Sequence, residues 1–268
     1  MNPIAFTIGG LEVRWYGILI AAAMIIAMVI TYRRSPNHDI SFDKLLDVLI
    51  VSILCGIIGA RLYYVIFQWD WYWGDLLRIL NIREGGLAIH GGLLAGILSG
   101  WIMCRVKKIP FLNALDLILP VVALAQSIGR WGNFFNQEAY GSPTTLPWGI
   151  MINGVKVHPT FLYESLWCLL VFIILSVLDR NRNFTGQIAC LYGILYSVER
   201  FFVEDLRTDS LMIGSLKMAQ LISLLVFSLC LALYLWLARK NVKHTDYRKT
   251  FIGNIFQDYN LINSYIVY

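Results

Sequence analysis

The first long apolar stretch of the chain runs from Trp15 to Tyr32 and reads WYGILIAAAMIIAMVITY. It contains no charged side chain, and Arg33 and Arg34 follow it directly. A helix needs about 20 mostly apolar residues to cross the hydrocarbon core of a bilayer, so this stretch predicts a membrane-spanning helix. The start of the chain lacks the pattern of a cleavable signal peptide, so we expect the helix to be retained.

The whole chain has the composition of a membrane protein. Of its 268 residues, 58% are hydrophobic and 15% are charged, and the mean hydropathy is +0.63. In soluble domains about a quarter of the residues are charged, so the low charged fraction predicts an all-α, polytopic membrane protein. We expect a single integral membrane domain over residues 1–240 and a cytoplasmic tail over residues 241–268. The predicted spans are Trp15–Tyr32, Leu45–Phe67, Leu87–Val106, Phe111–Ile128, His158–Leu178, Gln187–Phe202 and Leu216–Ala238.

Basic residues predict how these spans are oriented. They follow the first, third, fifth and seventh spans, at Arg33, Arg34, Arg105, Lys107, Lys108, Arg180, Arg182, Arg239, Lys240, Lys243, Arg248 and Lys249. In the connection after the second span, Arg78 and Arg83 are balanced by Asp70, Asp75 and Glu84. Short basic loops stay in the cytoplasm, so we expect the N-terminus outside and the C-terminus inside. The net charge of +5 follows this topology and does not indicate a nucleic-acid partner.

The fourth apolar run ends in the segment Gly129–Gly141, which reads GRWGNFFNQEAYG. Ionisable side chains at membrane depth are costly, so they often mark a site for a polar or charged ligand. Glycines let backbone amides approach such a ligand closely. The alternative is a sharp turn at a helix end, with Arg130 extending its side chain to water.

On the predicted topology, the other unusual polar residues gather toward the outer side. They are Tyr16, Arg61, His90, the segment from His158 to Glu164, and the group Tyr196, Arg200, Glu204 and Arg207. The cytoplasmic side has no comparable set. This convergence predicts a functional site at or near the outer leaflet.

Tyr196, Arg200 and Glu204 are spaced i, i+4 and i+8, and Arg207 follows three residues later. If the helix continues that far, they share one face. Two arginines around one glutamate leave positive charge to spare, and the guanidinium fork suits a phosphate. The alternative is a structural ion pair between helices.

His90 and Glu164 lie inside predicted apolar spans. His90 stands between glycine pairs, which make room for a substrate or for close helix packing. Histidine is a natural general acid or base near neutral pH, but a hydrogen-bonded core residue is an equal alternative. Glu164 needs a partner, and an arginine of the site is the natural one. The run from Gly91 to Gly100 and the residue His158 are interpreted as structural.

The five cysteines all fall in apolar segments, without metal-binding spacing, and are interpreted as small buried residues. The sequence has no metal, P-loop or dinucleotide motif, so we expect no metal and no nucleotide cofactor.

The segment Gly129–Gly141 resembles the signature G-R-x-G-N-F-x-N-x-E-x-x-G of the bacterial prolipoprotein diacylglyceryl transferases. The resemblance includes Trp15-Tyr16-Gly17, His90-Gly91-Gly92, the His158–Glu164 stretch and Arg200 to Arg207, and it excludes the tail. It implies a multi-pass protein of the bacterial cell membrane with an extracytoplasmic active site. The implied reaction moves diacylglyceryl from phosphatidylglycerol to the lipobox cysteine of a preprolipoprotein, forming a thioether and releasing glycerol 1-phosphate.

The resemblance also implies roles for individual residues. Arg130 and Arg200 would stabilise the phosphate charge, with Asn133 and Asn136 as neutral donors. His90 is the favoured base, with Glu138 and Glu204 as rivals. The remaining substrate-binding candidates are Tyr16, Tyr196, Gly141, Glu204 and Arg207. A transporter or flippase for an anionic lipid is the alternative function, although such proteins usually show internal repeats and a midplane site.

Overall fold

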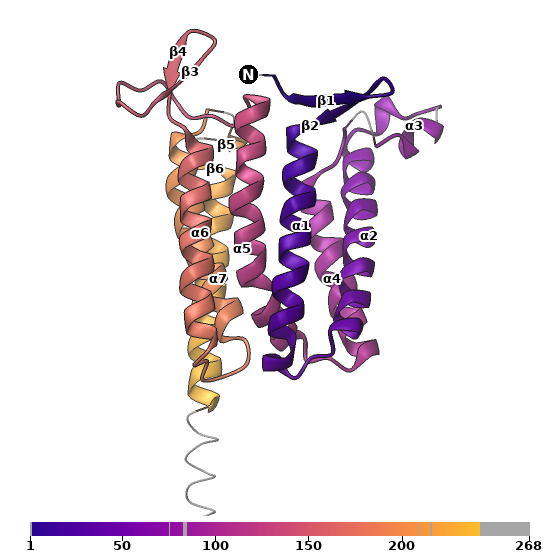
Figure 1. The fold of residues 1–268 in the computed structure, drawn as a ribbon, viewed down its shortest axis with the longest axis vertical. Coiled ribbons are helices and arrows are strands. Elements are labelled where there is room, and N and C mark those ends of the chain that lie inside the picture. Colours follow the sequence, from indigo (N-terminus) through magenta and orange to yellow (C-terminus); the bar gives the residue numbers. More distant parts are fainter. Residues whose placement is uncertain (1, 75, 83–84, 209, 215, 242–268) are drawn as a thin grey trace, which may run out of the picture. The chain divides into compact units, whose positions relative to one another are not determined.

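The computed structural model describes residues 2–74, 76–82, 85–208, 210–214 and 216–241. It is mostly helical (Figure 1). The helices are α1 (Trp15–Arg34), α2 (Phe42–Phe67), α3 (Leu76–Leu80), α4 (Ile89–Lys107), α5 (Phe111–Asn136), α6 (Thr160–Asp179), α7 (Gln187–Leu206) and a last helix, Met218–Asn241. Short 3₁₀ turns, η1 (Ser35–His38) and η2 (Trp69–Trp71), lie before and after α2.

Among the described residues, six helices are long and apolar enough to cross a membrane, which confirms a polytopic membrane protein. They are Trp15–His38, Phe42–Phe67, Ile89–Lys107, Phe111–Asn136, Thr160–Asp179 and Met218–Asn241. Helix α7 is as long as α6 but is not among them. The reason is its C-terminal half, where Glu199, Arg200, Glu204 and Asp205 interrupt the apolar sequence. The seventh span and the orientation stay predictions.

Helix α5 is longer than the predicted fourth span. It continues past Ile128 to Asn136 and includes Pro120. The first part of the Gly129–Gly141 segment is therefore helical rather than a loop, and it places Arg130, Asn133 and Asn136 on the last turns of α5. The helix ends where Gln137 takes a left-handed conformation, with φ of 55°.

The fold is not purely helical, because the part of the chain that the structure describes contains three two-stranded antiparallel sheets, which were not predicted from the sequence. Strands β1 (Ile4–Ile8) and β2 (Leu11–Arg14) form the first, β3 (Ile150–Ile152) and β4 (Val155–Val157) the second, and β5 (Met212–Ile213) and β6 (Leu216–Lys217) the third. Between β3 and β4, Asn153 and Gly154 have φ of 49° and 81°. This Asn-Gly pair is the strongest short hairpin signal in a sequence, and it was overlooked.

The chain divides into two compact units. The described residues of the first unit are 2–28 and those between Ile118 and Asn241. In it, α5, α6 and α7 lie side by side (Figure 1), around a core of Ala123, Val171, Leu175 and Ile188. Helix α7 also packs closely on the last helix, because a Cβ atom at Gly193 would overlap the sulfur of Cys230.

The second unit, Val29–Leu117, is built on the tight pairing of α2 and α4. A Cβ atom on Gly59 of α2 would lie 2.7 Å from the carbonyl oxygen of Gly91 on α4. Small residues allow membrane helices to approach this closely. The interpretation of the glycine run after His90 as helix packing is confirmed.

The five cysteines are free thiols, and each is buried or half-buried, as predicted. Several residues used for the topology lie outside the described residues: Asp75, Arg83, Glu84, Lys243, Arg248 and Lys249. The same holds for the predicted tail beyond Asn241.

Candidate active site

The first unit gathers three arginines around one buried carboxylate, that of Glu164. Glu164 lies in the second turn of α6 and has no exposed surface. Its Oε2 atom is 3.0 Å from Nη1 of Arg130, and its Oε1 atom is 3.3 Å from Nη1 of Arg200 and 3.9 Å from Nη1 of Arg207. The prediction that Glu164 pairs with an arginine of the site is confirmed.

Arg200 links Glu164 to a second buried carboxylate. Its Nη2 atom pairs with Oε2 of Glu204, one turn further along α7. Helix α7 ends at Leu206, so Arg207 is not on the helix face as the spacing suggested. It has an extended backbone that bridges to Gly141, and its guanidinium still reaches toward Glu164.

A lysine closes the C-terminal end of α7 near this cluster. The Nζ atom of Lys217 donates to the carbonyl oxygens of Glu204, Asp205 and Arg207. The last carbonyls of a helix lack partners within the helix and carry partial negative charge, so a cation is favourable there. Lys217 thereby holds Glu204 and Arg207 in place from the backbone side.

The predicted surplus of positive charge is not found. Helix α6 contributes Glu164, and α7 contributes a third acid, Glu199, which has electrostatic interactions with Glu164 and the three arginines. The cluster therefore contains three arginines and three glutamates. Arg130, Arg200 and Arg207 are partly exposed, at 22%, 21% and 13% of their side-chain surface, so a ligand can reach them.

Hydroxyl groups join α5 to α6 beside the cluster. Ser127 Oγ donates to the carbonyl of Ser165, and Ser165 Oγ donates to the carbonyl of Ser127, at 2.8 and 2.9 Å. The indole Nε1 of Trp131 donates to Ser165 Oγ at 3.1 Å. This small-residue contact fixes the backbone that positions Arg130 next to Glu164.

Two tyrosines of α7, Tyr192 and Tyr196, precede its charged residues. The rings of Tyr192 and Tyr196 stack with centroids 5.8 Å apart, and Tyr192 Oη donates to Gln126 Oε1. Tyr196 has an electrostatic interaction with Arg130. Of the tyrosines proposed as phosphate or glycerol donors, Tyr196 is therefore brought to the arginine cluster.

The rest of the Gly129–Gly141 segment follows the end of α5. The Nδ2 atom of Asn136 donates to Oε1 of Glu138 at 3.1 Å, and the amide of Glu138 donates to the carbonyl of Asn133. Glu138 is exposed. Gly141 is buried, and its amide donates to the carbonyl of His158 at 3.0 Å.

Gly141 leaves no space for a side chain, because an added Cβ would lie 2.7 Å from Cβ of His158. The backbone N–H of His158 donates to the carbonyl oxygen of Ser142, and Nδ1 of its ring lies 3.3 Å from Oη of Tyr163. These contacts fit the structural interpretation of His158.

Tyr16 of α1 lies against the backbone of α5. A Cβ atom on Gly132 would overlap its ring, and the neighbouring Trp15 stacks on Phe135 with ring centroids 5.2 Å apart. Two glycines of the signature, Gly132 and Gly141, are thus explained by close packing.

His90 lies in the second unit, at the start of α4. Its side chain is exposed, and its ring centroid is 6.3 Å from that of Tyr63. Tyr63 also lines an apolar groove along α2 and α4, together with Leu62, Ile66, Leu94, Leu98 and Trp101.

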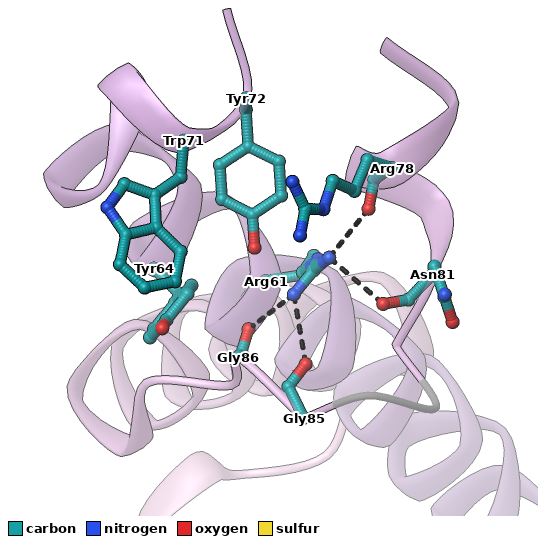
Figure 2. Close-up of a pocket in the computed structure, with 8 residues that line it drawn as sticks. All are labelled: Arg61, Tyr64, Trp71, Tyr72, Arg78, Asn81, Gly85 and Gly86. Carbon is teal, nitrogen blue, oxygen red and sulfur yellow. Dashed lines mark hydrogen bonds between the residues drawn. The ribbon is translucent and has the colours of Figure 1, made fainter. Parts of the chain in front are cut away.

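Arg61 has a structural role, although it was among the unusual polar residues of the outer side. It is 7% exposed, and its five N–H groups donate to five backbone carbonyls. Figure 2 shows the bonds to Arg78, Asn81, Gly85 and Gly86. Nε donates to Ile79, Nη1 to Gly85 and Gly86, and Nη2 to Arg78 and Asn81. Its guanidinium also lies 5.2 Å from the ring centroid of Tyr72. No N–H group is left for a phosphate.

Sequence reasoning missed Glu199, Lys217 and the Ser127–Ser165 contact. An acid next to Arg200 in an apolar helix was a usable signal for Glu199. Lys217 and the serines gave no signal, because only the folded chain brings them to the helix ends and interfaces where they act.

Comparison with known proteins agrees with the resemblance. The family model described as prolipoprotein diacylglyceryl transferase matches residues 3–236. A protein of Clostridioides difficile (strain 630) is 48% identical, with 90% of this chain and 97% of that protein covered. Proteins of Finegoldia magna and Clostridium novyi (strain NT) are each 50% identical, covering 84% and 91% of this chain and 92% and 98% of their own length.

All three relatives are named phosphatidylglycerol–prolipoprotein diacylglyceryl transferase. The match covers the arginine cluster, the Gly129–Gly141 segment and the start of α4. This chain belongs to the prolipoprotein diacylglyceryl transferase family.

Proposed function

We propose that this enzyme transfers the diacylglyceryl group of phosphatidylglycerol to the lipobox cysteine of preprolipoproteins, the first step of lipoprotein maturation. The arginine cluster around Glu164 carries this proposal, together with the activity printed in the relatives' names. Phosphatidylglycerol has one negative charge, and partly exposed guanidinium groups at membrane depth suit its phosphate.

The reaction breaks the bond between the diacylglycerol carbon and the phosphate oxygen. The substrate thiol loses its proton to a base, its sulfur forms the thioether, and glycerol 1-phosphate leaves with the electron pair. Charge grows on the phosphate as the bond breaks. Arg130 and Arg200 therefore stabilise the transition state more than the ground state. Arg207 adds a third positive charge near the phosphate.

The neutral donors surround the leaving phosphate and its glycerol. Asn133 and Asn136, on the last turns of α5, and Tyr196, beside Arg130, are suited to donate hydrogen bonds to its oxygens. Tyr16 and Gly141 shape the ends of the site. Glu204 orients Arg200 through their ion pair.

His90 is our choice of base for the thiol. Its exposed imidazole at the start of α4 is available to a substrate. Glu204 is engaged in the ion pair with Arg200, which suits it to orient that arginine. Glu138, exposed beside Asn136, remains the rival.

The acyl chains of the lipid need an apolar surface. The second unit offers one in the groove along α2 and α4, which Tyr63 lines, and the ring of Tyr63 also lies near that of His90. Apolar walls of this kind accept acyl chains that stay within the bilayer.

The topology belongs to the same proposal. We place the enzyme in the bacterial cytoplasmic membrane, with α7 as a seventh span, the N-terminus outside and the site toward the extracytoplasmic side. Residues 1–240 then form one catalytic domain. Of the charged residues that lower the hydropathy of α7, Arg200 and Glu204 pair with each other, which reduces their cost in the membrane.

The test uses purified protein in nonionic detergent with phosphatidylglycerol and a lipobox peptide. We expect the peptide to gain the mass of one diacylglyceryl group as glycerol phosphate is released, and Arg130→Ala to abolish the gain. Loss of activity in a folded His90→Ala variant would support the role of His90 as the general base. If the folded wild-type protein binds or moves phospholipid without modifying the peptide, the proposed transferase activity is wrong and the protein is a lipid transporter.

A further inference from the structure

Glu199 differs from the other two acids of the arginine cluster. Its residue is 4% exposed, and neither carboxylate oxygen has a hydrogen-bond partner among the described residues. Glu164 and Glu204 are each within ion-pair distance of an arginine nitrogen. A buried polar group without a hydrogen bond is costly, so Glu199 is expected to serve a purpose other than packing.

The groups around Glu199 come from three helices. Arg130 lies on α5, Glu164 and Cys168 lie on α6, and the remaining groups lie on α7 or directly after it. The titratable and charged groups that interact with Glu199 are Arg130, Glu164, Cys168, Tyr192, Tyr196, Arg200 and Arg207. Burial opposes a negative charge on Glu199, the field of the three arginines favours it, and no direct hydrogen bond holds the carboxylate among the described residues.

The charge of the cluster changes when a phosphate binds. With all six groups ionised, three arginines balance three glutamates. A phosphate monoanion then adds one negative charge in an environment of low dielectric constant, where uncompensated charge is expensive. One proton removes this excess. Glu199 is the acid best placed to take it, because Glu164 and Glu204 are fixed by their arginines.

We propose that Glu199 is a positioning residue for the lipid phosphate, an inference that rests on the proposed function. Glu199 takes up one proton when the phosphate binds to the arginines and releases it when the phosphate leaves. The proton comes from water, and no other bond is formed or broken. Glu199 need not touch the lipid, because it acts through the charge of the arginines. Binding of an anionic phospholipid is therefore coupled to proton uptake.

Equilibrium binding tests this coupling without requiring catalysis. Binding of phosphatidylglycerol from nonionic micelles is measured between about pH 6 and about pH 9 for the wild type, Glu199→Gln and Glu12→Gln. Glu12 is an exposed carboxylate of β2, so its variant is the matched control. Diacylglycerol, which lacks the phosphate, is the control lipid.

We expect the wild-type affinity to fall by up to about tenfold per pH unit in the upper part of this range, as one linked proton requires. Glu199→Gln, which is neutral at every pH, should bind with a constant affinity close to that of the wild type at low pH. Glu12→Gln should follow the wild type, and diacylglycerol binding should not depend on pH.

Two results would overturn the proposal. One is the same pH dependence in Glu199→Gln as in the wild type, and the other is weak binding of folded Glu199→Gln at every pH, which would make Glu199 a permanently charged partner. If Glu199→Gln does not fold, proton uptake is measured on the wild type in weak buffer, where zero protons per bound lipid rejects the proposal. Failure of the transferase itself would appear separately, as lipid binding without transfer.

Discussion

Nη1 of Arg130, from the Gly129–Gly141 segment, lies 3.0 Å from Oε2 of Glu164, which has no exposed surface. The segment that identified the family is thus anchored by an acid from a different helix. An arginine held on one side by a buried carboxylate presents its other N–H groups in a fixed direction. This preorganisation favours binding of an anionic group such as phosphate, whose oxygens can accept two parallel hydrogen bonds from a planar guanidinium.

Arg130→Lys should lower kcat/KM for phosphatidylglycerol by about 100-fold or more, because a lysine cannot keep the bond to Glu164 and donate two parallel bonds to phosphate. The assay is peptide modification at several lipid concentrations. Arg14→Lys, at an exposed arginine of β2, is the matched control and should stay near wild type. Near-normal turnover of folded Arg130→Lys would remove Arg130 from the phosphate site.

Glu164→Gln should destabilise the protein by about 3 kcal/mol, because it removes the buried carboxylate charge that pairs with Arg130 and Arg200. The free energy of unfolding in mixed micelles measures this loss. Glu12→Gln should change it by less than about 0.5 kcal/mol. In a double-mutant cycle, Arg130→Met should cost much less in the Glu164→Gln background than in the wild type. Additive effects would mean that the two side chains do not interact.

Gly59→Ala should destabilise the pairing of α2 and α4 by about 1–3 kcal/mol, because the new methyl group meets the backbone of Gly91 at 2.7 Å. Gly17→Ala in α1 is the control, since a Cβ atom there meets nothing within 4 Å. Alanine favours a helix over glycine, so this control should be neutral or stabilising by about 0.5 kcal/mol. Thermal unfolding of both variants tests the contrast, and equal effects would contradict the close packing.

Arg61→Lys should loosen the segment that Arg61 ties to α2. A lysine has three donors in place of five and cannot reach all five carbonyls, so buried acceptors lose their partners. Hydrogen exchange at Ala88, whose amide donates to the carbonyl of Ala60 on α2, is a local reporter. We expect exchange there to speed up at least about tenfold, which corresponds to about 1.4 kcal/mol, while exchange in α6 stays unchanged. An unchanged Ala88 rate would show that the carbonyl contacts do not hold this segment.

Much of the molecule followed from the sequence because hydropathy and helix length are local properties. The apolar runs predicted from Trp15, Phe111 and His158 each form a helix, which for the last begins at Thr160, since a bilayer leaves few other ways to satisfy backbone groups. The Gly129–Gly141 signature indicated both the protein family and the candidate residue Arg130. The Asn153–Gly154 hairpin is also encoded locally, because both residues readily adopt the positive φ that a two-residue turn requires.

The sequence by itself therefore determined the membrane class, the family and the candidate residues. The tertiary structure decided their partners: that Glu164 joins Arg130 and Arg200, that Glu199 completes the charge balance, and that Arg61 serves the backbone instead of a phosphate. These outcomes depend on which helix faces meet and at what distance. A charge gains its role from the groups that surround it after folding, and those groups are far away in the sequence.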